Sequence, residues 1–343
     1  MTVPDSSELK PAAAPPGAWK LKPPYSARTV LIVLIATMLL TWSFERTDMH
    51  RAVMMSVEGV AVLIGVRSES DVSKGASRLV ESSFPLVVEK ETPLNRIENF
   101  DRNDLPWLSY VETRTTVSKV YDYDTLELQE ITETEEYLVE PIGYLTYVLG
   151  KMFESLEIAV WGTLLAIILG MPLAFFGARN YTPHPLLYGL SRGISSFCRA
   201  IPELVSALYL VLMYGFGPIA GVLALGFHCA GFFGKFYADD IENADKGPQE
   251  ALRATGAGKL KILRFAVLPQ VIPQYIAYTQ YILERNVRMA TVIGIVGAGG
   301  IGIELKGRFD MFNFGHVTTI LLVIFLTVLL LERISQAIRK RII

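Results

Sequence analysis

Apolar residues gather in long segments of this chain, and stretches rich in charged residues separate them. A segment of about 20 apolar residues is long enough for a helix to cross a bilayer. Several of these segments contain Gly or Pro, which membrane helices tolerate when neighbouring helices satisfy the freed backbone groups. The pattern predicts an all-α integral membrane protein with about six transmembrane helices. The candidate spans are residues 29–44, 153–176, 201–216, 217–234, 270–295 and 317–331.

Basic residues indicate how these spans are oriented. Lys and Arg cluster in the N-terminal arm, in the segment 235–264 and in the C-terminal tail, which six spans place on one side of the membrane. Cytoplasmic loops of membrane proteins carry an excess of Lys and Arg. We therefore expect both termini to be cytoplasmic. The first apolar segment has no small-residue cleavage site, so we expect an uncleaved helix.

The spans divide the chain into four parts. Residues 1–26, rich in Pro, Ala and Lys, predict a disordered cytoplasmic arm, and residues 27–44 the first transmembrane helix. Residues 45–150 form an acidic external (periplasmic) region, in which about twenty Asp and Glu stand against ten Lys and Arg. Residues 151–343 hold the other five spans and a basic cytoplasmic loop, 244–269.

The acidic external region carries two local patterns. Residues 52–84 predict one or two helices. Residues 110–139 alternate β-branched or aromatic with polar side chains around the turn-like sequence "DYD". Such alternation on both sides of a turn predicts a β-hairpin.

Composition adds little evidence for chemistry. Hydrophobic residues make up 51% of the 343 residues and charged residues 19%, a balance that favours a membrane protein. The two cysteines, Cys198 and Cys229, lie in apolar surroundings, so we expect neither a disulfide framework nor a metal site. The motifs HExxH and GxSxG are absent, so we expect no enzyme activity. We expect no nucleic-acid partner.

Two glycine-containing motifs resemble nucleotide-binding sites but lack residues that such sites require. The series Gly297-x-Gly299-x-x-Gly302 lacks the buried strand and the acidic residue about 20 positions later that a dinucleotide fingerprint requires. The sequence "GAGKLK" has Leu260 where a P-loop requires Ser or Thr. We therefore expect no cofactor in this chain. The glycines 297, 299, 300 and 302 instead predict a packing and bending element near an external gate.

The basic loop 244–269, between the candidate spans 217–234 and 270–295, predicts a short helix followed by a turn. Gly247 and Pro248 suit the start of a helix, and Glu250 is favourable in its first turn. Gly256 can end the helix by adopting a left-handed backbone conformation. A second helix is expected from about Lys259 into the membrane.

Within this loop, Glu250-Ala251, Gly256 six residues after the Glu, and Leu268-Pro269 resemble the "EAA" cytoplasmic loop of ATP-binding-cassette (ABC) importer permeases. Leu252 stands where that motif has a second Ala, and Ala266 where it often has Ile. The resemblance implies that the loop docks into a cleft of an ATPase subunit and transmits nucleotide-driven closure to the membrane helices.

Three more stretches, 163–180, 198–208 and 290–305, resemble the phosphonate-transport subfamily of these permeases. The resemblance implies a type I importer-like fold in the bacterial plasma (inner) membrane and a homodimer with two ATPase subunits, which bind ATP and Mg²⁺. It also implies an external substrate-binding protein and uptake of a phosphonate, or of a related phosphorus oxyanion such as phosphite or a phosphate ester.

Ionisable residues within the apolar segments are candidates for the translocation path, because such groups are costly in a membrane. Arg199 and Glu203 flank Pro202 at a spacing that puts them on one face of a continuous helix. They either line the path or form a mutual salt bridge that orders the helix. Arg285 and its neighbours Glu284 and Arg288 either guide an anion or extend to the interface. His228 is expected to be a packed, hydrogen-bonded core residue.

Two alternative functions remain open. One is an importer of the same architecture for another small solute, such as an amino acid. The other is a secondary transporter or channel that works without ATP. Proteins of that second class often contain paired discontinuous helices at repeated positions, and the sequence offers no convincing second copy.

Overall fold

The computed structural model describes residues 26–342 except 99, 103 and 122–127. Its chain divides into two compact units, residues 1–78 and 79–343, and the division falls inside a helix, α3 (Asp71–Ser83). The predicted disordered arm, 1–26, lies outside the described residues apart from Ser26, whose hydroxyl accepts from the backbone N–H of Thr29 and caps the first helix.

The first unit contains the helices α1 (Ala27–Arg46) and α2 (Met49–Leu63) and the start of α3. α1 is long and apolar enough to cross a membrane, as its 16-residue apolar run predicts once flanking residues extend it. The expectation of one or two helices in residues 52–84 is confirmed, because α2 and α3 are two separate helices.

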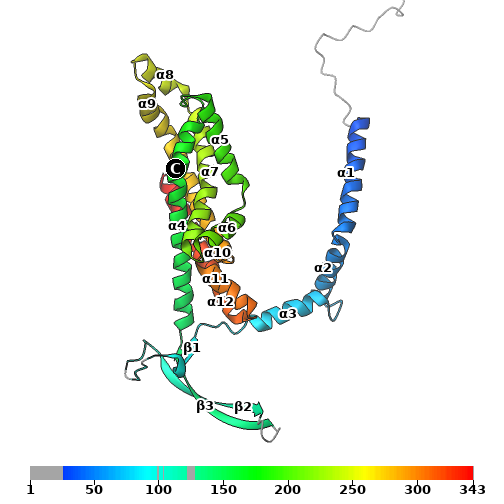
Figure 1. The fold of residues 1–343 in the computed structure, drawn as a ribbon. Coiled ribbons are helices and arrows are strands. Elements are labelled where there is room, and N and C mark those ends of the chain that lie inside the picture. The colour runs from blue at the N-terminus through cyan, green and yellow to red at the C-terminus, as the bar shows by residue number, and fades with distance from the viewer. Residues whose placement is uncertain (1–25, 99, 103, 122–127, 343) are drawn as a thin grey trace, which may run out of the picture. The chain divides into compact units, whose positions relative to one another are not determined.

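The second unit is a helical bundle with a small sheet at one end (Figure 1). Its helices are α4 (Gly143–Gly177), α5 (Pro185–Ala200), α6 (Glu203–Tyr214), α7 (Pro218–Asn243), α8 (Lys246–Ala254), α9 (Lys259–Ile262), a π-helical turn (Leu263–Val267), α10 (Leu268–Gly294), α11 (Ile301–Asp310) and α12 (Phe314–Ile342).

The centre of the bundle is the contact between α4 and α7, in which glycines of each helix receive large side chains of the other. Without a Cβ, a glycine lets a neighbouring helix approach closely, and this is a common way to pack helices in a membrane. The contact is reciprocal, and in each helix the two glycines are eight residues apart. Gly162 and Gly170 of α4 face Leu225 and Phe233, while Gly226 and Gly234 of α7 face Leu165 and Leu173.

By length and composition, four of the described helices can cross a membrane: α1, α4, α7 and α12. α5 and α6 count as a fifth span only together, as a pair bent by 89°. The predicted span 201–216 is therefore wrong as a separate span, because it corresponds to the 12-residue helix α6. α5 has no counterpart among the six predicted segments. α10 is 27 residues long, but it carries charged residues in its second half and is not among the four.

The predicted β-hairpin is confirmed and belongs to a three-stranded antiparallel sheet of order β1-β3-β2. β2 (Tyr110–Tyr121) pairs with β3 (Leu128–Glu140) in a register that sets Tyr110 opposite Val139. The sequence "DYD", predicted as the turn, lies outside the described residues. The third strand, β1 (Lys90–Pro93), was not predicted.

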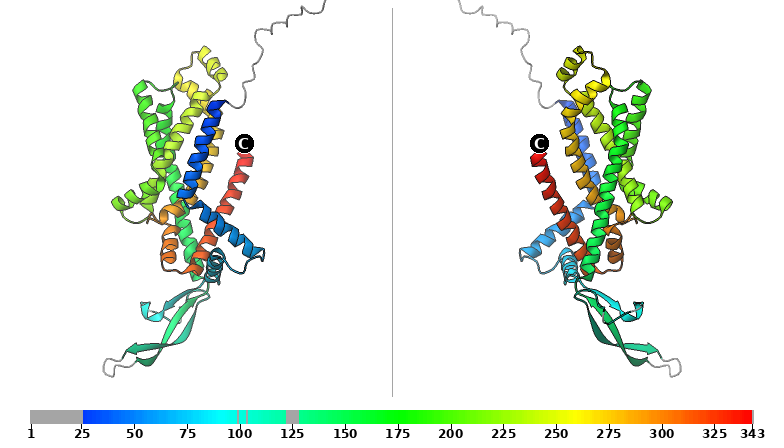
Figure 2. Two further views of the ribbon diagram at one scale, coloured as in Figure 1. Left: turned by 90° about the vertical axis from the view of Figure 1, so that its right-hand side faces the viewer. Right: turned by 90° about the vertical axis from the view of Figure 1, so that its left-hand side faces the viewer.

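The sheet continues directly into the helical bundle. β3 ends at Glu140 and α4 begins at Gly143, and the backbone N–H groups of Tyr144 and Leu145 donate to the carbonyl of Val88. The predicted boundary at 150/151 therefore falls inside α4, and the sheet belongs to the same compact unit as the bundle. α8 and α9 lie at the opposite end of α4 in the views of Figure 2.

Gly231 of α7 tests how tightly α5 packs against α7. A Cβ at Gly231 would lie 2.5 Å from the backbone oxygen of Ser195, which cannot move aside, whereas a Cβ at Gly193 of α5 would meet open space. We expect Gly231→Ala to destabilise the protein by about 1–3 kcal/mol. Gly193→Ala is the matched control and should be neutral or slightly stabilising, since alanine favours a helix. Thermal unfolding of the detergent-solubilised protein measures both, and equal effects would contradict this packing.

Candidate functional site

The loop with the EAA-like residues folds as its sequence predicts. Asp245 caps α8 by accepting from the backbone N–H of Gly247, at 3.1 Å. Gln249 is buried, and its amide donates to the carbonyls of Ala244 and Asp245 at 3.1 and 3.0 Å. Gly256 has a φ of +81°, the left-handed conformation that favours glycine. The first helix therefore ends where the sequence predicts.

The candidate docking residues lie on successive elements of this loop. Glu250 and Ala251 are exposed on α8, and Gly256 is exposed just after it. Leu268 and Pro269 form the first turn of α10, which continues directly from the π-helical turn Leu263–Val267. The π-helical turn before Leu268 was not predicted.

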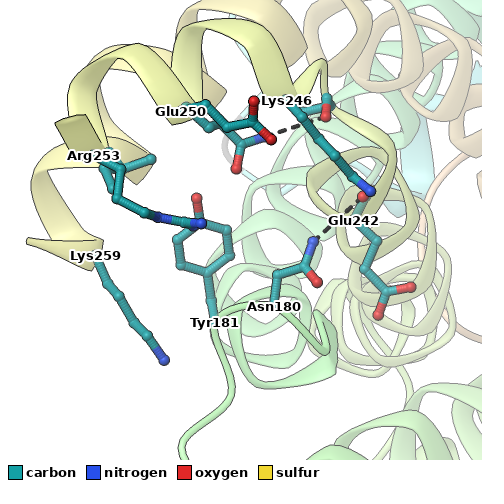
Figure 3. A pocket seen from close by; sticks show the side chains of 10 residues that line it. Asn180, Tyr181, Glu242, Lys246, Glu250, Arg253 and Lys259 are labelled. Atoms are coloured by element: carbon teal, nitrogen blue, oxygen red, sulfur yellow. Dashed lines mark hydrogen bonds between the residues drawn. The ribbon is translucent and has the colours of Figure 1, made fainter.

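A pocket of about 360 Å³ lies between α8, the end of α7 and the loop between α4 and α5. In Figure 3 the side chain of Arg253 extends from α8 towards Tyr181. Burial raises the pKa of Tyr181, and the positive charge of Arg253 partly opposes that rise. The residues that line the pocket are Asn180, Tyr181, Glu242, Ala244, Lys246, Gln249, Glu250, Arg253, Lys259 and Ile262.

Polar contacts tie the floor of this pocket to the bundle. The carboxylate of Glu242 accepts from the backbone N–H of Arg179 at 2.7 Å and lies 3.2 Å from the guanidinium of Arg192. Arg192 also binds Asp239 at 2.5 Å and donates to the carbonyl of Gly177. The end of α4, the middle of α5 and the end of α7 are thus joined to one another at the floor of the pocket.

The structure contradicts the expectation that Arg199 and Glu203 share one helical face. Pro202 keeps the residue before it out of the helical conformation, and Ile201 is extended, with φ −84° and ψ 122°. α5 therefore ends at Ala200, and α6 begins at Glu203 in a new direction. A mutual salt bridge between Arg199 and Glu203 is absent from the ion pairs of the described residues.

Glu203 instead joins a buried polar cluster that crosses the bundle. Its carboxylate forms an ion pair with Arg285 of α10 and lies 3.0 Å from Nε2 of His228 on α7. The Nδ1 atom of His228 lies 3.0 Å from the carbonyl oxygen of Ile201, which satisfies a backbone group freed by the break between α5 and α6. Glu203 is only 8% exposed and His228 6%. The expectation of a packed, hydrogen-bonded His228 is confirmed.

Arg199 lies beside this cluster but has a different kind of partner. Its guanidinium lies over the rings of Phe232 and Phe236, at 4.6 and 5.7 Å from their centroids. The guanidinium of Arg285 also lies over Phe232, at 5.3 Å. The Nε atom of Arg199 is shielded from solvent and has no hydrogen-bond partner among the described residues. From the sequence, Arg285 either guides an anion or extends to the interface. Its partner Glu203 lies 82 positions away, so no local pattern predicts the ion pair.

An uncharged set of hydrogen bonds continues from this cluster into the core. The thiol of Cys229 donates to the side-chain oxygen of Asn286 at 3.1 Å. The amide of Asn286 donates to the hydroxyl of Thr163 at 2.9 Å. These contacts tie α4, α7 and α10 together without a formal charge. Both cysteines are free, and the described residues hold no group of three His, Cys, Asp or Glu that could bind a metal ion.

The glycine-rich stretch is a tight turn between α10 and α11, as its predicted bending role requires. Gly297, Gly299 and Gly300 have φ values of +93°, +89° and +74°. Gly302 packs against the backbone of Gly294, so α11 starts close to the end of α10.

Two residues of α4 cap the helix that follows this turn. The carboxylate of Glu154 accepts from the N–H of Gly300 at 3.0 Å, and the hydroxyl of Ser155 accepts from the N–H of Ile301 at 2.9 Å. The first N–H groups of α11, which a nucleotide phosphate would need, are therefore occupied by the chain's own side chains.

The bundle, its broken helix and its loop of EAA type define an integral membrane transport component. The chain belongs to the family of binding-protein-dependent transport system inner membrane components, whose family model matches residues 162–343. It is therefore a multi-pass membrane protein.

Named relatives make this assignment more specific. A protein of Stutzerimonas stutzeri, provisionally named phosphite transport system permease protein HtxE, is 53% identical over 260 residues, which are 76% of this chain and all of that protein. The phosphate-import permease protein PhnE of Mycolicibacterium smegmatis is 44% identical over 187 residues, which are 54% of this chain and 35% of that protein.

Solved structures show the same fold. An inward-facing structure of the MetNI methionine ABC transporter matches with a TM-score of 0.51 at 20% sequence identity. The match covers 57% of this chain and 96% of that one. The bundle therefore has the fold of an ABC importer permease, as its sequence predicts.

Substitution of Gly299 tests whether the glycine turn requires its conformation. Its positive φ is strained for any residue with a Cβ, and a Cβ there would lie 2.9 Å from the backbone of Pro218. We expect Gly299→Ala to lower thermal stability by at least about 1 kcal/mol. Gly307→Ala is the control, because Gly307 lies in α11 with open space around it. Thermal unfolding in detergent compares the two, and an unaffected Gly299→Ala would show that the turn adapts.

Proposed function

We propose that this chain is the membrane-spanning subunit of an ATP-driven importer for a phosphonate or a related phosphorus oxyanion. Two copies of the chain work with two ATPase subunits, which bind ATP and Mg²⁺, and with an external binding protein that delivers the solute. The chain itself makes and breaks no bond. Its contribution is to stabilise outward-facing and inward-facing states differently as ATP is bound and hydrolysed.

The observation that carries the coupling part of this proposal is the construction of α8. It is a short, capped helix with an exposed Glu250, and the pocket beneath it is joined to α4, α5 and α7 by Glu242 and Arg192. Gln249 of α8 holds the segment that leads from α7, so a force applied to α8 by a docked ATPase would reach the end of α7 and, through Glu242 and Arg192, the helices α4 and α5. The basic character of this loop supports a cytoplasmic location. The sheet would then lie on the external side, because it is at the other end of α4 (Figure 1).

The substrate class rests on the relatives. Those with 42–53% identity are named as permeases for phosphite, phosphate or phosphonate, whereas a D-methionine permease of Haemophilus influenzae is only 24% identical. The resemblance of residues 163–180, 198–208 and 290–305 to the phosphonate subfamily supports the same class. An amino acid is the weaker candidate.

Substitutions in the loop test the coupling role. Glu250→Lys reverses an exposed charge on α8, and Gly256→Val forces a β-branched residue into a left-handed conformation. We expect both variants to reach the membrane but to lose solute uptake, while the ATPase subunits still hydrolyse ATP. Gly258→Val is a matched control, since Gly258 has a φ of −71° and open space around it. Uptake and ATP hydrolysis are measured in proteoliposomes, and unchanged uptake in both loop variants would refute docking.

Reconstitution of the complete transporter tests the substrate. The complex with its ATPase and binding protein should take up methylphosphonate or phosphite only with internal ATP, and methionine should not replace them. Uptake of methionine alone would favour the amino-acid importer. Uptake that persists without the ATPase and collapses with the proton gradient would favour a secondary transporter.

A further inference from the structure

We infer that the bend between α5 and α6 contains an oxyanion site, in which Arg199 and Arg285 bind the phosphorus oxyanion and Glu203 occupies Arg285 in its absence. This inference rests on the proposed function and adds the residues that contact the solute within the membrane. It concerns Arg199, Glu203, His228, Phe232 and Arg285.

The cluster carries an excess of positive charge. Arg285 has Glu203 as its counterion, but Arg199 has no ion pair among the described residues. The cluster holds two guanidinium groups and one carboxylate, and an imidazole adds no negative charge, so at least one positive charge has no counterion among these residues. Arg199 is partly buried and its Nε atom is shielded from solvent, and a charge without a counterion is costly in such surroundings within a membrane protein. A bound monoanion removes this cost.

The two arginines share an aromatic neighbour. Both guanidinium groups lie over the ring of Phe232, at 4.6 and 5.3 Å from its centroid, so two helices, α5 and α10, each bring an arginine to the same aromatic side chain. Stacking on an aromatic ring uses the face of a guanidinium and leaves its edge donors free. The planar fork of N–H donors suits the oxygens of a phosphonate or phosphite group.

Arg199 also has a hydrogen-bond donor without an acceptor among the described residues. The Nε atom of Arg199 is shielded from solvent and lacks a partner in the described part of the chain. Buried polar atoms of folded proteins usually have a hydrogen-bond partner. A ligand oxygen at the edge of this guanidinium would supply one. The site thus lacks both a negative charge and a hydrogen-bond acceptor, and an oxyanion provides both.

Glu203 adds a means of release. It occupies Arg285 in the present structure, and His228 lies within 3.0 Å of the same carboxylate oxygen. An oxyanion that binds Arg285 therefore replaces Glu203, which remains next to the imidazole of His228. When the anion leaves, Glu203 returns to Arg285. This exchange keeps Arg285 paired at each stage and prevents the anion from binding too tightly to move on.

A purely structural role would predict different behaviour. The helices are already joined by the uncharged contacts of Cys229, Asn286 and Thr163. Arg199 takes no part in those contacts, so its removal leaves them intact. The two roles can therefore be separated by measuring ligand binding and stability in the same variant.

The test uses the purified complex of permease and ATPase without its binding protein, so that added methylphosphonate reports only on the membrane site. We expect millimolar methylphosphonate to raise the thermal unfolding temperature of the wild type and of Arg288→Gln. Arg288 is the matched control, because it lies on the same helix as Arg285, pairs with Glu284 and is 47% exposed. Arg199→Gln should lose this rise, and Arg199→Lys should retain part of it.

Glu203→Gln should change affinity in the opposite direction. It removes the competitor for Arg285, so half of the thermal shift should occur at a lower methylphosphonate concentration than in the wild type. In proteoliposomes with the binding protein, uptake by Arg199→Gln should fall about tenfold or more, as expected for one lost hydrogen bond to a charged group. A structural role does not predict opposite effects on affinity from Arg199 and Glu203.

The outcomes separate this inference from the proposed function. A wild type that takes up methylphosphonate, together with an Arg199→Gln variant that keeps both uptake and the thermal shift, would overturn the site and leave the function standing. A wild type without any thermal shift would also overturn the site. A wild-type complex that takes up neither methylphosphonate nor phosphite with its binding protein would refute the function itself.

Discussion

The close approach of α4 and α7 is the constraint on which the rest of residues 79–343 depends. Glycines on each helix receive large side chains of the other, so the two helices pack more tightly than larger residues would permit. α4 connects the sheet at one end with the loop 178–184 at the other, and α7 leads into α8. The sheet, the pocket beneath α8 and the buried polar cluster are therefore positioned by one shared contact.

Ion pairs hold the bent pair α5–α6 against the rest of the bundle at two places, one near α8 and one at the bend. Near α8, Arg192 of α5 binds Asp239 and Glu242 of α7. At the bend, Glu203 of α6 binds Arg285 of α10. Because ionisable groups within membrane helices are costly unless paired, a movement of this pair must exchange one charged partner for another. That requirement favours discrete arrangements over gradual ones, as a transporter that alternates between two states needs.

Several features of the site were predictable because their causes are local. Asp245, Gly247 and Gly256 delimit α8 through capping and a left-handed turn, which involve only neighbouring residues. The hairpin 110–139 followed from its alternation in the same way. Pro202 carried a local signal too, since the residue before a proline is rarely helical. The prediction of a shared helical face ignored that signal and placed Arg199 and Glu203 together wrongly.

The sequence by itself determined the membrane class, the positions of the apolar helices α1, α4, α7 and α12, and the short helix of the EAA-like loop. These depend on apolar length and on interactions within a few residues. Only the tertiary structure decided that Glu203 pairs with Arg285, that Arg199 lies over the ring of Phe232 and that Glu154 caps α11. The partners in these three contacts lie 33 to 146 positions apart in the sequence and belong to different elements. These partners come into contact only when the helices pack together into the bundle.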